Sequence, residues 1–187
     1  LPNAALGVNG SSICKGETAT VTIQSSENSV SYQLRDDSDN SYIGTPKTGN
    51  SSVLTFNVTP NTTTTYNILA SNPAGCEVTL TNKATVTVYD LPDITKVVDD
   101  PTICNGEAAT ITLNNSDNDV NYQLRLDSDN SIIDATLSAG GNITFTANPT
   151  VTTVYNVYAT NGNNCSAELS DKPTVTVRDL PNDLLAV

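Results

Sequence analysis

The 187-residue chain is long enough for one or two domains, and it carries 20 acidic against 8 basic side chains, a net charge of −12. So few basic groups argue against nucleic acid and anionic membrane surfaces as partners, because little is available to displace phosphate counterions. The longest apolar runs are a few residues, so no membrane-inserting segment is predicted.

Short strands are predicted along the first half of the chain. Each alternates apolar and polar side chains or is rich in β-branched residues, which suit a pleated, half-buried surface. The predicted strands are 18–24, 30–35, 53–58, 64–70 and 84–89. Turn residues recur between them and no helical periodicity is found, so the pattern indicates an antiparallel β-sandwich.

The second half of the chain repeats the first. Matching segments are SICKGETATVTI (12–23) with TICNGEAATITL (102–113), TTTYNILASN (63–72) with TTVYNVYATN (152–161), and KATVTVYDLP (83–92) with KPTVTVRDLP (172–181). A period near 90 residues suits a self-contained sandwich domain. We therefore predict one repeat over 1–90, a second over 91–179, and the start of a further linker or repeat over 180–187.

Each repeat holds one pair of cysteines at equivalent positions, Cys14 with Cys76 and Cys104 with Cys165. Zinc ligation would need CxxC-type spacing or histidines, and the sequence has neither. We therefore predict two disulfides, Cys14–Cys76 and Cys104–Cys165, each tying one end of its own domain. Disulfides place the protein outside the reducing cytoplasm.

An acidic decapeptide occurs in both repeats, as YQLRDDSDNS (32–41) and YQLRLDSDNS (122–131). One interpretation is a hairpin turn, since Asp, Ser and Asn bond their own backbone and tolerate left-handed conformations. The alternative is a calcium site using Asp37 and Asp39, and Asp127 and Asp129 in the second repeat. Calcium wants six to eight oxygens, and the Gly and Glu that complete an EF-hand loop are missing, so the turn is favoured.

No catalytic residue or obligatory cofactor is predicted. The chain has no histidine, so the usual serine and cysteine nucleophile systems would lack their base. The tyrosine pairs Tyr32/Tyr122 and Tyr66/Tyr155 alternate with core positions and are predicted to be buried. Tyr42, the candidate sugar-contacting aromatic, is replaced by Ile132 in the second repeat.

Taken together, the strings C-x-G-E-x-A-T, V-x-YQLR and P-x-x-TTxY-N, followed by a second Cys and K-x-T-V-T-V, resemble Ig-like repeats of very large surface proteins of Bacteroidota. The segment TPNTTTTYNILASN (59–72) is also similar to the fibronectin type III pattern. The resemblance implies two tandem Ig-like antiparallel β-sandwich domains, an all-β fold.

The same resemblance implies a function and a location. It implies export, cell-surface display, and a non-catalytic stalk or spacer role in a large adhesin, with neighbouring repeats of the same chain as partners. Two alternatives stay open: a carbohydrate- or protein-binding Ig-like module, and the shaft subunit of an extracellular filament.

Overall fold

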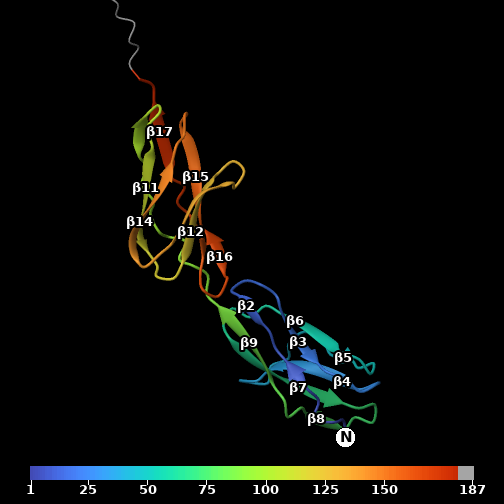
Figure 1. Cartoon of the computed structure of the whole chain (residues 1–187). Coiled ribbons are helices and arrows are strands. Elements are labelled where there is room, and N and C mark those ends of the chain that lie inside the picture. The colour runs from blue at the N-terminus through green and yellow to red at the C-terminus, as the bar shows by residue number, and fades with distance from the viewer. Residues whose placement is uncertain (181–187) are drawn as a thin grey trace, which may run out of the picture. The chain divides into compact units, whose positions relative to one another are not determined.

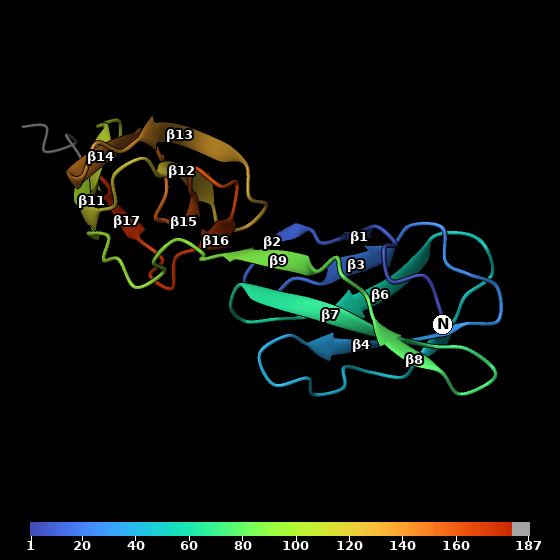
Figure 2. The ribbon, with the colours of Figure 1, turned by 90° about the horizontal axis from the view of Figure 1, so that it is seen from below.

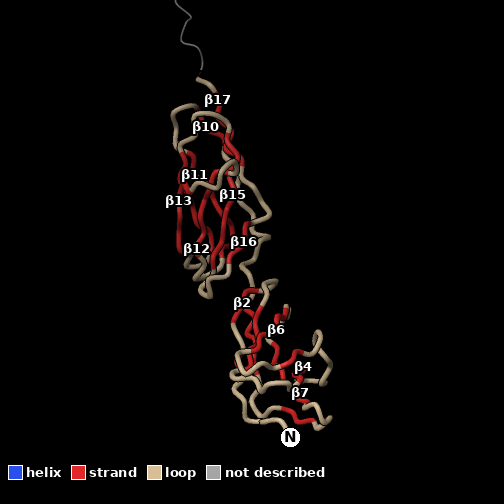
Figure 3. The backbone as a smooth tube through the Cα atoms, turned by 90° about the vertical axis from the view of Figure 1, so that its right-hand side faces the viewer, coloured by secondary structure: helices blue, strands red, loops and turns tan. Residues whose placement is uncertain are grey.

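A computed structural model describes residues 1–180 of the chain, and the end of the segment predicted over 180–187 lies outside the described residues. The described residues form strands, turns and loops, with no helix among them (Figure 3), so the all-β prediction is confirmed. It follows that none of them lies in a helix able to span a membrane. The chain divides into two compact units, one from Leu1 to Asp90 and one beginning at Leu91.

The first unit is a sandwich of two sheets (Figure 1). One sheet has the order β1-β3-β6 and the other β2-β9-β7-β4-β5, with β8 also pairing with β7. The strands are β1 (Val8–Asn9), β2 (Ser12–Cys14), β3 (Ala19–Ile23), β4 (Ser31–Asp36), β5 (Lys47–Thr48), β6 (Leu54–Val58), β7 (Thr64–Ser71), β8 (Glu77–Thr79) and β9 (Ala84–Tyr89). The five predicted strands correspond to β3, β4, β6, β7 and β9.

The second unit repeats this arrangement, with β11 paired to β14 and a larger sheet ordered β10-β17-β15-β12-β13, in which β16 also pairs with β15. Its strands are β10 (Thr102–Cys104), β11 (Ala109–Ser116), β12 (Asn121–Leu126), β13 (Ile132–Leu137), β14 (Gly141–Ala147), β15 (Thr153–Thr160), β16 (Ser166–Glu168) and β17 (Thr174–Arg178). The main difference is β13, which has six residues where β5 has two.

Each unit has its own core between its two sheets. In β4, Tyr32 and Leu34 are buried, as the alternation predicts. All four repeated tyrosines are at most 4% exposed, which confirms their predicted burial. The Tyr32 hydroxyl accepts a hydrogen bond from the Glu27 N–H at 2.8 Å, so its polar end is satisfied inside the sandwich. Burial raises the pKa of Tyr32.

The chain changes sheets early in the first unit. β1 runs antiparallel to β3, whereas β2, only two residues later, runs parallel to β9 (Figure 2). Gly10 lies at this crossing. A Cβ atom there would lie 2.0 Å from the Thr85 carbonyl oxygen, closer than packed atoms approach, so the crossing requires glycine. As a result β2 and β9, the first and last strands of the larger sheet in chain order, lie side by side and point the same way.

Candidate functional site

The acidic decapeptide of the first unit forms a tight turn at the end of β4. The Asp36 N–H donates to the Ser41 carbonyl, and the Asn40 N–H donates to the Asp36 carbonyl, both at 2.9 Å. Asn40 adopts a left-handed conformation with φ of 59°, and Asn130 in the second unit has φ of 58°. The turn interpretation is therefore confirmed, with asparagine at the position that needs positive φ.

Two of the four predicted calcium ligands are used within the turn itself. The Asp39 carboxylate accepts a hydrogen bond from the Ser41 N–H at 2.8 Å, and Asp129 accepts one from the Ser131 N–H at 2.9 Å. These hydrogen bonds from the serines hold the pKa of Asp39 and Asp129 below the ordinary aspartate value. Both carboxylates thus act as local backbone caps.

The other two predicted ligands are held by lysines from a distant part of each repeat. The Lys83 Nζ atom lies 2.7 Å from an Asp37 carboxylate oxygen, and Lys172 lies 2.6 Å from Asp127. The hydrogen bond from each lysine is the main reason that the pKa of its aspartate is lowered. Because half of the Lys83 side chain is solvent-exposed, such a pair adds little stability and mainly fixes the position of the turn.

A buried asparagine beneath the turn was not identified from the sequence. Asn67, in β7, donates to the Asp37 carboxylate at 3.0 Å and to the Asn40 side-chain oxygen at 2.9 Å. Its own side-chain oxygen accepts from Arg35 Nε at 2.8 Å. Every polar atom of this 3%-exposed side chain is therefore satisfied. The available signal was the asparagine that follows the repeated tyrosine in both TTTYN and TTVYN.

The second unit keeps this asparagine but satisfies it less completely. Asn156 donates to the Asn130 side-chain oxygen at 2.8 Å, while its own side-chain oxygen is buried without a hydrogen-bond partner among the described residues. Arg125 instead lies over the Tyr158 ring, 3.8 Å from its centre, and hydrogen-bonds Gln123. The replacement of Leu69 by Tyr158 accounts for the different position of the arginine.

The described residues contain no group of three or more His, Cys, Asp or Glu side chains placed to hold a metal ion. Asp37, Asp39, Asp127 and Asp129 each have protein partners, and a calcium ion would have to displace them. Calcium binding therefore stays a prediction. Calorimetry with calcium and with a chelator tests it through the melting temperature.

The depression beside the first turn is lined by Asp36, Asp37, Ser38 and Thr62–Thr65. Its side chains offer carboxylates and hydroxyls but no aromatic ring for a sugar to stack on and no basic group for a phosphate. The arrangement holds a turn in place, and it presents no pairing of a nucleophile with a base.

The predicted disulfide pairing is wrong. Cys14 and Cys165 are disulfide-bonded, whereas Cys76 and Cys104 are exposed free thiols. Neither Cys14–Cys76 nor Cys104–Cys165 is formed, so the prediction of one disulfide inside each domain is corrected.

The register of the first unit explains this result. Cys14 pairs with Tyr89, which lies three residues beyond Val86, the partner of Thr64 at the start of β7. Cys76 lies near the other end of β7, because the next residue, Glu77, pairs with Ser71, the last residue of β7. The two cysteines are therefore separated by about eleven residues along the strand direction, or ~36 Å. Bonded cysteines have Cα atoms only about 4.4–6.8 Å apart.

The second unit has the same geometry. Cys104 pairs with Arg178, three residues beyond the Val175–Thr153 pair at the start of β15. Cys165 precedes Ser166, which pairs with Thr160 at the end of β15. The two cysteines of each repeat thus lie at opposite ends of the sandwich, and the expectation that they tie one domain end fails for this reason.

No family model matches the chain, and no curated protein matches it. Among solved structures, a Glu-to-Ala variant of three consecutive Ig domains of titin matches with a TM-score of 0.50 and 16% identity, over 95% of this chain and 66% of that one. An I-band fragment of titin matches with a TM-score of 0.48 and 16% identity, over 93% and 65%. The fibronectin(III)-like modules of CbhA from Clostridium thermocellum match with a TM-score of 0.44 and 13% identity, over 97% and 100%.

The first titin match, with a TM-score of 0.50, bears on the fold. The chain spans about two thirds of the length of the two titin fragments. At 16% identity, the first titin match shows the fold alone. The chain has an Ig-like β-sandwich fold, as predicted.

Proposed function

We propose that the chain is a non-catalytic spacer segment of a large secreted or cell-surface repeat protein, of the adhesin kind. This proposal rests on one observation: the features that the two repeats share are those that hold the fold together. Both repeats have the buried tyrosines, the anchored turn and the lysine–aspartate pair. A repeated binding surface would repeat its exposed side chains, yet Tyr42 corresponds to Ile132.

The strand arrangement supports a mechanical role. The first strand of the larger sheet, β2, runs parallel to the last strand, β9, through Ser12–Thr87, Ile13–Val88 and Cys14–Tyr89. Pulling the two ends of the unit apart moves these strands in opposite directions along their length. Their hydrogen bonds are then loaded together in shear, because none can open before its neighbours. The pairing of β10 with β17 is also parallel, so both units have this property.

A location outside the cytoplasm is supported by the disulfide-bonded cysteines, since disulfides persist in oxidising compartments. A non-catalytic role is supported by the carboxylates, which serve turns and ion pairs. The acidic, hydroxyl-rich surface also suits a repetitive chain that must avoid self-association.

A second candidate function rests on β13, which is one of the edge strands of the larger sheet of the second unit. Its Ile132 and Leu137 side chains are 58% and 66% exposed. An apolar edge strand can accept a strand from another protein. This surface belongs to the second unit alone, because β5 has two residues and neither is apolar.

Pulling single molecules from their two ends tests the spacer function. Under reducing conditions, Lys15→Pro removes the N–H that donates to the Tyr89 carbonyl at 2.9 Å. We expect a lower unfolding force for the first unit, while the unchanged second unit serves as the control within the same molecule. An unchanged force would contradict load transfer through β2 and β9.

A binding assay separates the two candidate functions. If the chain is a spacer, we expect it to show no saturable binding to a glycan array or to strand-forming peptides. Saturable peptide binding that is lost in an Ile132→Thr/Leu137→Thr variant, and kept in Tyr42→Thr as the control, would favour the binding module.

A further inference from the structure

The edge strand β13 of the second unit presents apolar side chains to solvent. Ile133 and Leu137 are 40% and 66% exposed, whereas Asp134 and Thr136 are half-buried. Since alternate side chains face opposite sides of a strand, the apolar row points outward and Asp134 points toward the sandwich. An exposed apolar edge strand is a place where copies of a protein pair with each other.

The pairing of β13 with β12 shows which backbone groups of β13 point outward. The Ser138 N–H donates to the Val120 carbonyl at 2.9 Å, so the Ser138 backbone faces β12. Hydrogen bonding alternates along an antiparallel pair, so the Asp134 backbone also faces β12 and that of Ala135 points outward. The Ala135 N–H is therefore a group that an added strand would need to bond.

The Asp134 carboxylate already occupies this position. One of its oxygens accepts a hydrogen bond from the Ala135 N–H at 2.8 Å, and the other accepts one from the Thr146 N–H of β14, also at 2.8 Å. Because β14 belongs to the smaller sheet, one side chain covers donors on edge strands of both sheets. A strand added to β13 would have to displace the carboxylate, and hydrogen bonds to a charged acceptor are the stronger ones.

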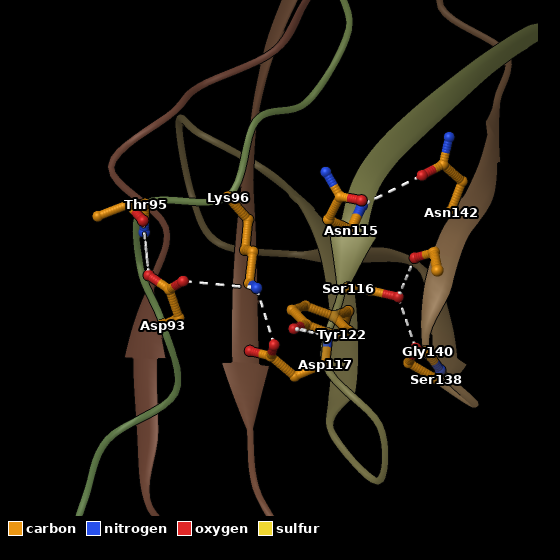
Figure 4. Close-up of polar contacts among 11 residues, drawn as sticks. Asp93, Thr95, Lys96, Asn115, Ser116, Asp117, Tyr122, Ser138, Gly140 and Asn142 are labelled. Carbon is orange, nitrogen blue, oxygen red and sulfur yellow. Dashed lines mark hydrogen bonds and ion pairs between the residues drawn. The ribbon is translucent and has the colours of Figure 1, made fainter.

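A second set of contacts fixes the end of β13 to the smaller sheet (Figure 4). The Oγ atom of Ser138, the residue after β13, lies 2.5 Å from Ser116 Oγ, and Ser116 donates to the Gly141 carbonyl at 2.6 Å. The Gly140 N–H donates to Ser138 Oγ at 2.9 Å. Both serines are at most 5% exposed, so these hydrogen bonds are shielded from water and hold β13 against β11 and β14.

The first unit covers the corresponding edge with the opposite charge. Its edge strand β5 carries Lys47, whose Nζ atom donates to the Thr55 carbonyl of β6 at 2.6 Å and lies 5.4 Å from the centre of the Phe56 ring. By their order in the sheets, β5 and β6 correspond to β13 and β14. The residue equivalent to Asp134 is Gly44. Both units thus bond the open backbone of the same strand, each with a different charged side chain.

We propose that Asp134 prevents two copies of the chain from pairing through β13. Antiparallel pairing of two β13 strands about a twofold axis at Ala135 would place Ile133 of each copy opposite Leu137 of the other. Because this register is self-complementary and apolar, the partner that the strand fits is a second copy of the chain. The two Asp134 carboxylates would lie diagonally across such a pair and repel each other.

The proposal concerns self-association and does not depend on the spacer function. The pulling experiment above tests the load-bearing strands, whereas the experiment below measures association alone, so the two can fail separately. A strand from another protein would meet the same carboxylate.

Sedimentation velocity of the intact chain, with the free thiols Cys76 and Cys104 alkylated, tests the proposal. Asp134→Ala frees both N–H groups and removes the charge. In a dimer, the Ala135 N–H of each copy then forms a new hydrogen bond, so we expect self-association to tighten by roughly tenfold or more relative to the parent chain. A variant that is folded by circular dichroism and stays as monomeric as the parent would overturn the proposal.

Asp134→Asn is the conservative variant and carries the same test if Asp134→Ala does not fold. It keeps the size of the side chain but offers one carbonyl oxygen to two N–H donors. We expect it to associate more strongly than the parent and less strongly than Asp134→Ala. Association no stronger than that of the parent would count against the proposed role.

Two further variants identify the surface. Asp134→Ala/Leu137→Lys adds a charge to the exposed row of β13 and should restore the monomer, and continued association would mean that another surface pairs and that the proposal is wrong. Lys47→Met removes the cover of the first unit and should leave the chain monomeric, because β5 has only two residues to offer. Dimers of Lys47→Met would contradict a specific role for β13.

Discussion

At the residue scale, the acidic turn depends on one buried side chain beneath it. Asn67 joins Asp37, Asn40 and Arg35, which belong to the turn and to β4. The turn therefore keeps its conformation through hydrogen bonds to a central strand, whereas the ion pair of its half-buried Asp37 with the half-exposed Lys83 contributes little stability.

Asn67→Ala should lower the free energy of unfolding by about 1–3 kcal/mol, because it removes three part-buried hydrogen bonds. Asn156→Ala is the matched control and should cost less, because the Asn156 side-chain oxygen has no partner to lose among the described residues. Urea unfolding of both variants measures the difference. An equal or larger loss for Asn156→Ala would contradict this account of the turn.

The turn should also make the fold sensitive to acid. The pKa values of Asp37, Asp39, Asp127 and Asp129 are lowered in the folded state, so their contribution to stability is complete above the ordinary value of 3.8. It is lost as the pH falls through the lowered values, because protonation then favours the unfolded chain. We expect the melting temperature to drop below about pH 4.

The matched variant is Asp37→Asn/Asp127→Asn, which removes two of these acids. Its melting temperature should depend less steeply on pH below 4 than that of the parent chain. Loss of net negative charge on acidification acts in the opposite direction, by relieving repulsion. A parent melting temperature that rises as the pH falls would show that the charge effect is larger than that of the turn.

The residue-level predictions succeeded where local chemistry decides the outcome. Alternation alone predicted that Tyr32 and Tyr122 are buried, and the turn preferences of Asp and Asn predicted the hairpin. Asn67 was missed because a polar residue in a strand is usually read as solvent-facing. The cysteine pairing failed because the spacing shows two cysteines per repeat but does not show at which end of a sheet each one lies.

At the scale of elements, the crossing of the chain between sheets sets the geometry of the unit. β1 and β2 are too short to give a periodic signal, so the sequence predicted neither of them. Longer strands such as β7 and β9 were predicted because five or more alternating residues distinguish a strand from a loop. The parallel β2–β9 pair, which determines the position of Cys14, was therefore visible only in the structure.

Gly10→Ala should destabilise the first unit by about 1–3 kcal/mol, the usual cost of forcing volume into packed structure. The new methyl group would meet the Thr85 carbonyl, which belongs to the β9 backbone and cannot rotate away. Gly7→Ala is the control, since its Cβ would lie 3.6 Å from the nearest atoms. Equal melting temperatures for the two variants would show that the crossing can shift to accommodate a side chain.

At the scale of the whole molecule, two Ig-like units follow one another along the chain, and each has a parallel pair of first and last strands in its larger sheet. In the proposed spacer, a pulling force that enters one end of a unit and leaves at the other is resisted by this pair. The two units would therefore bear load independently, each through its own strands.

Stretching single reduced molecules from their two ends tests the proposed spacer function most directly. Because β2–β9 and β10–β17 are both parallel pairs that are loaded in shear, we predict two unfolding events at comparable force, one for each unit. A unit that extends gradually, without a force peak, would contradict the proposal that the chain is a load-bearing spacer.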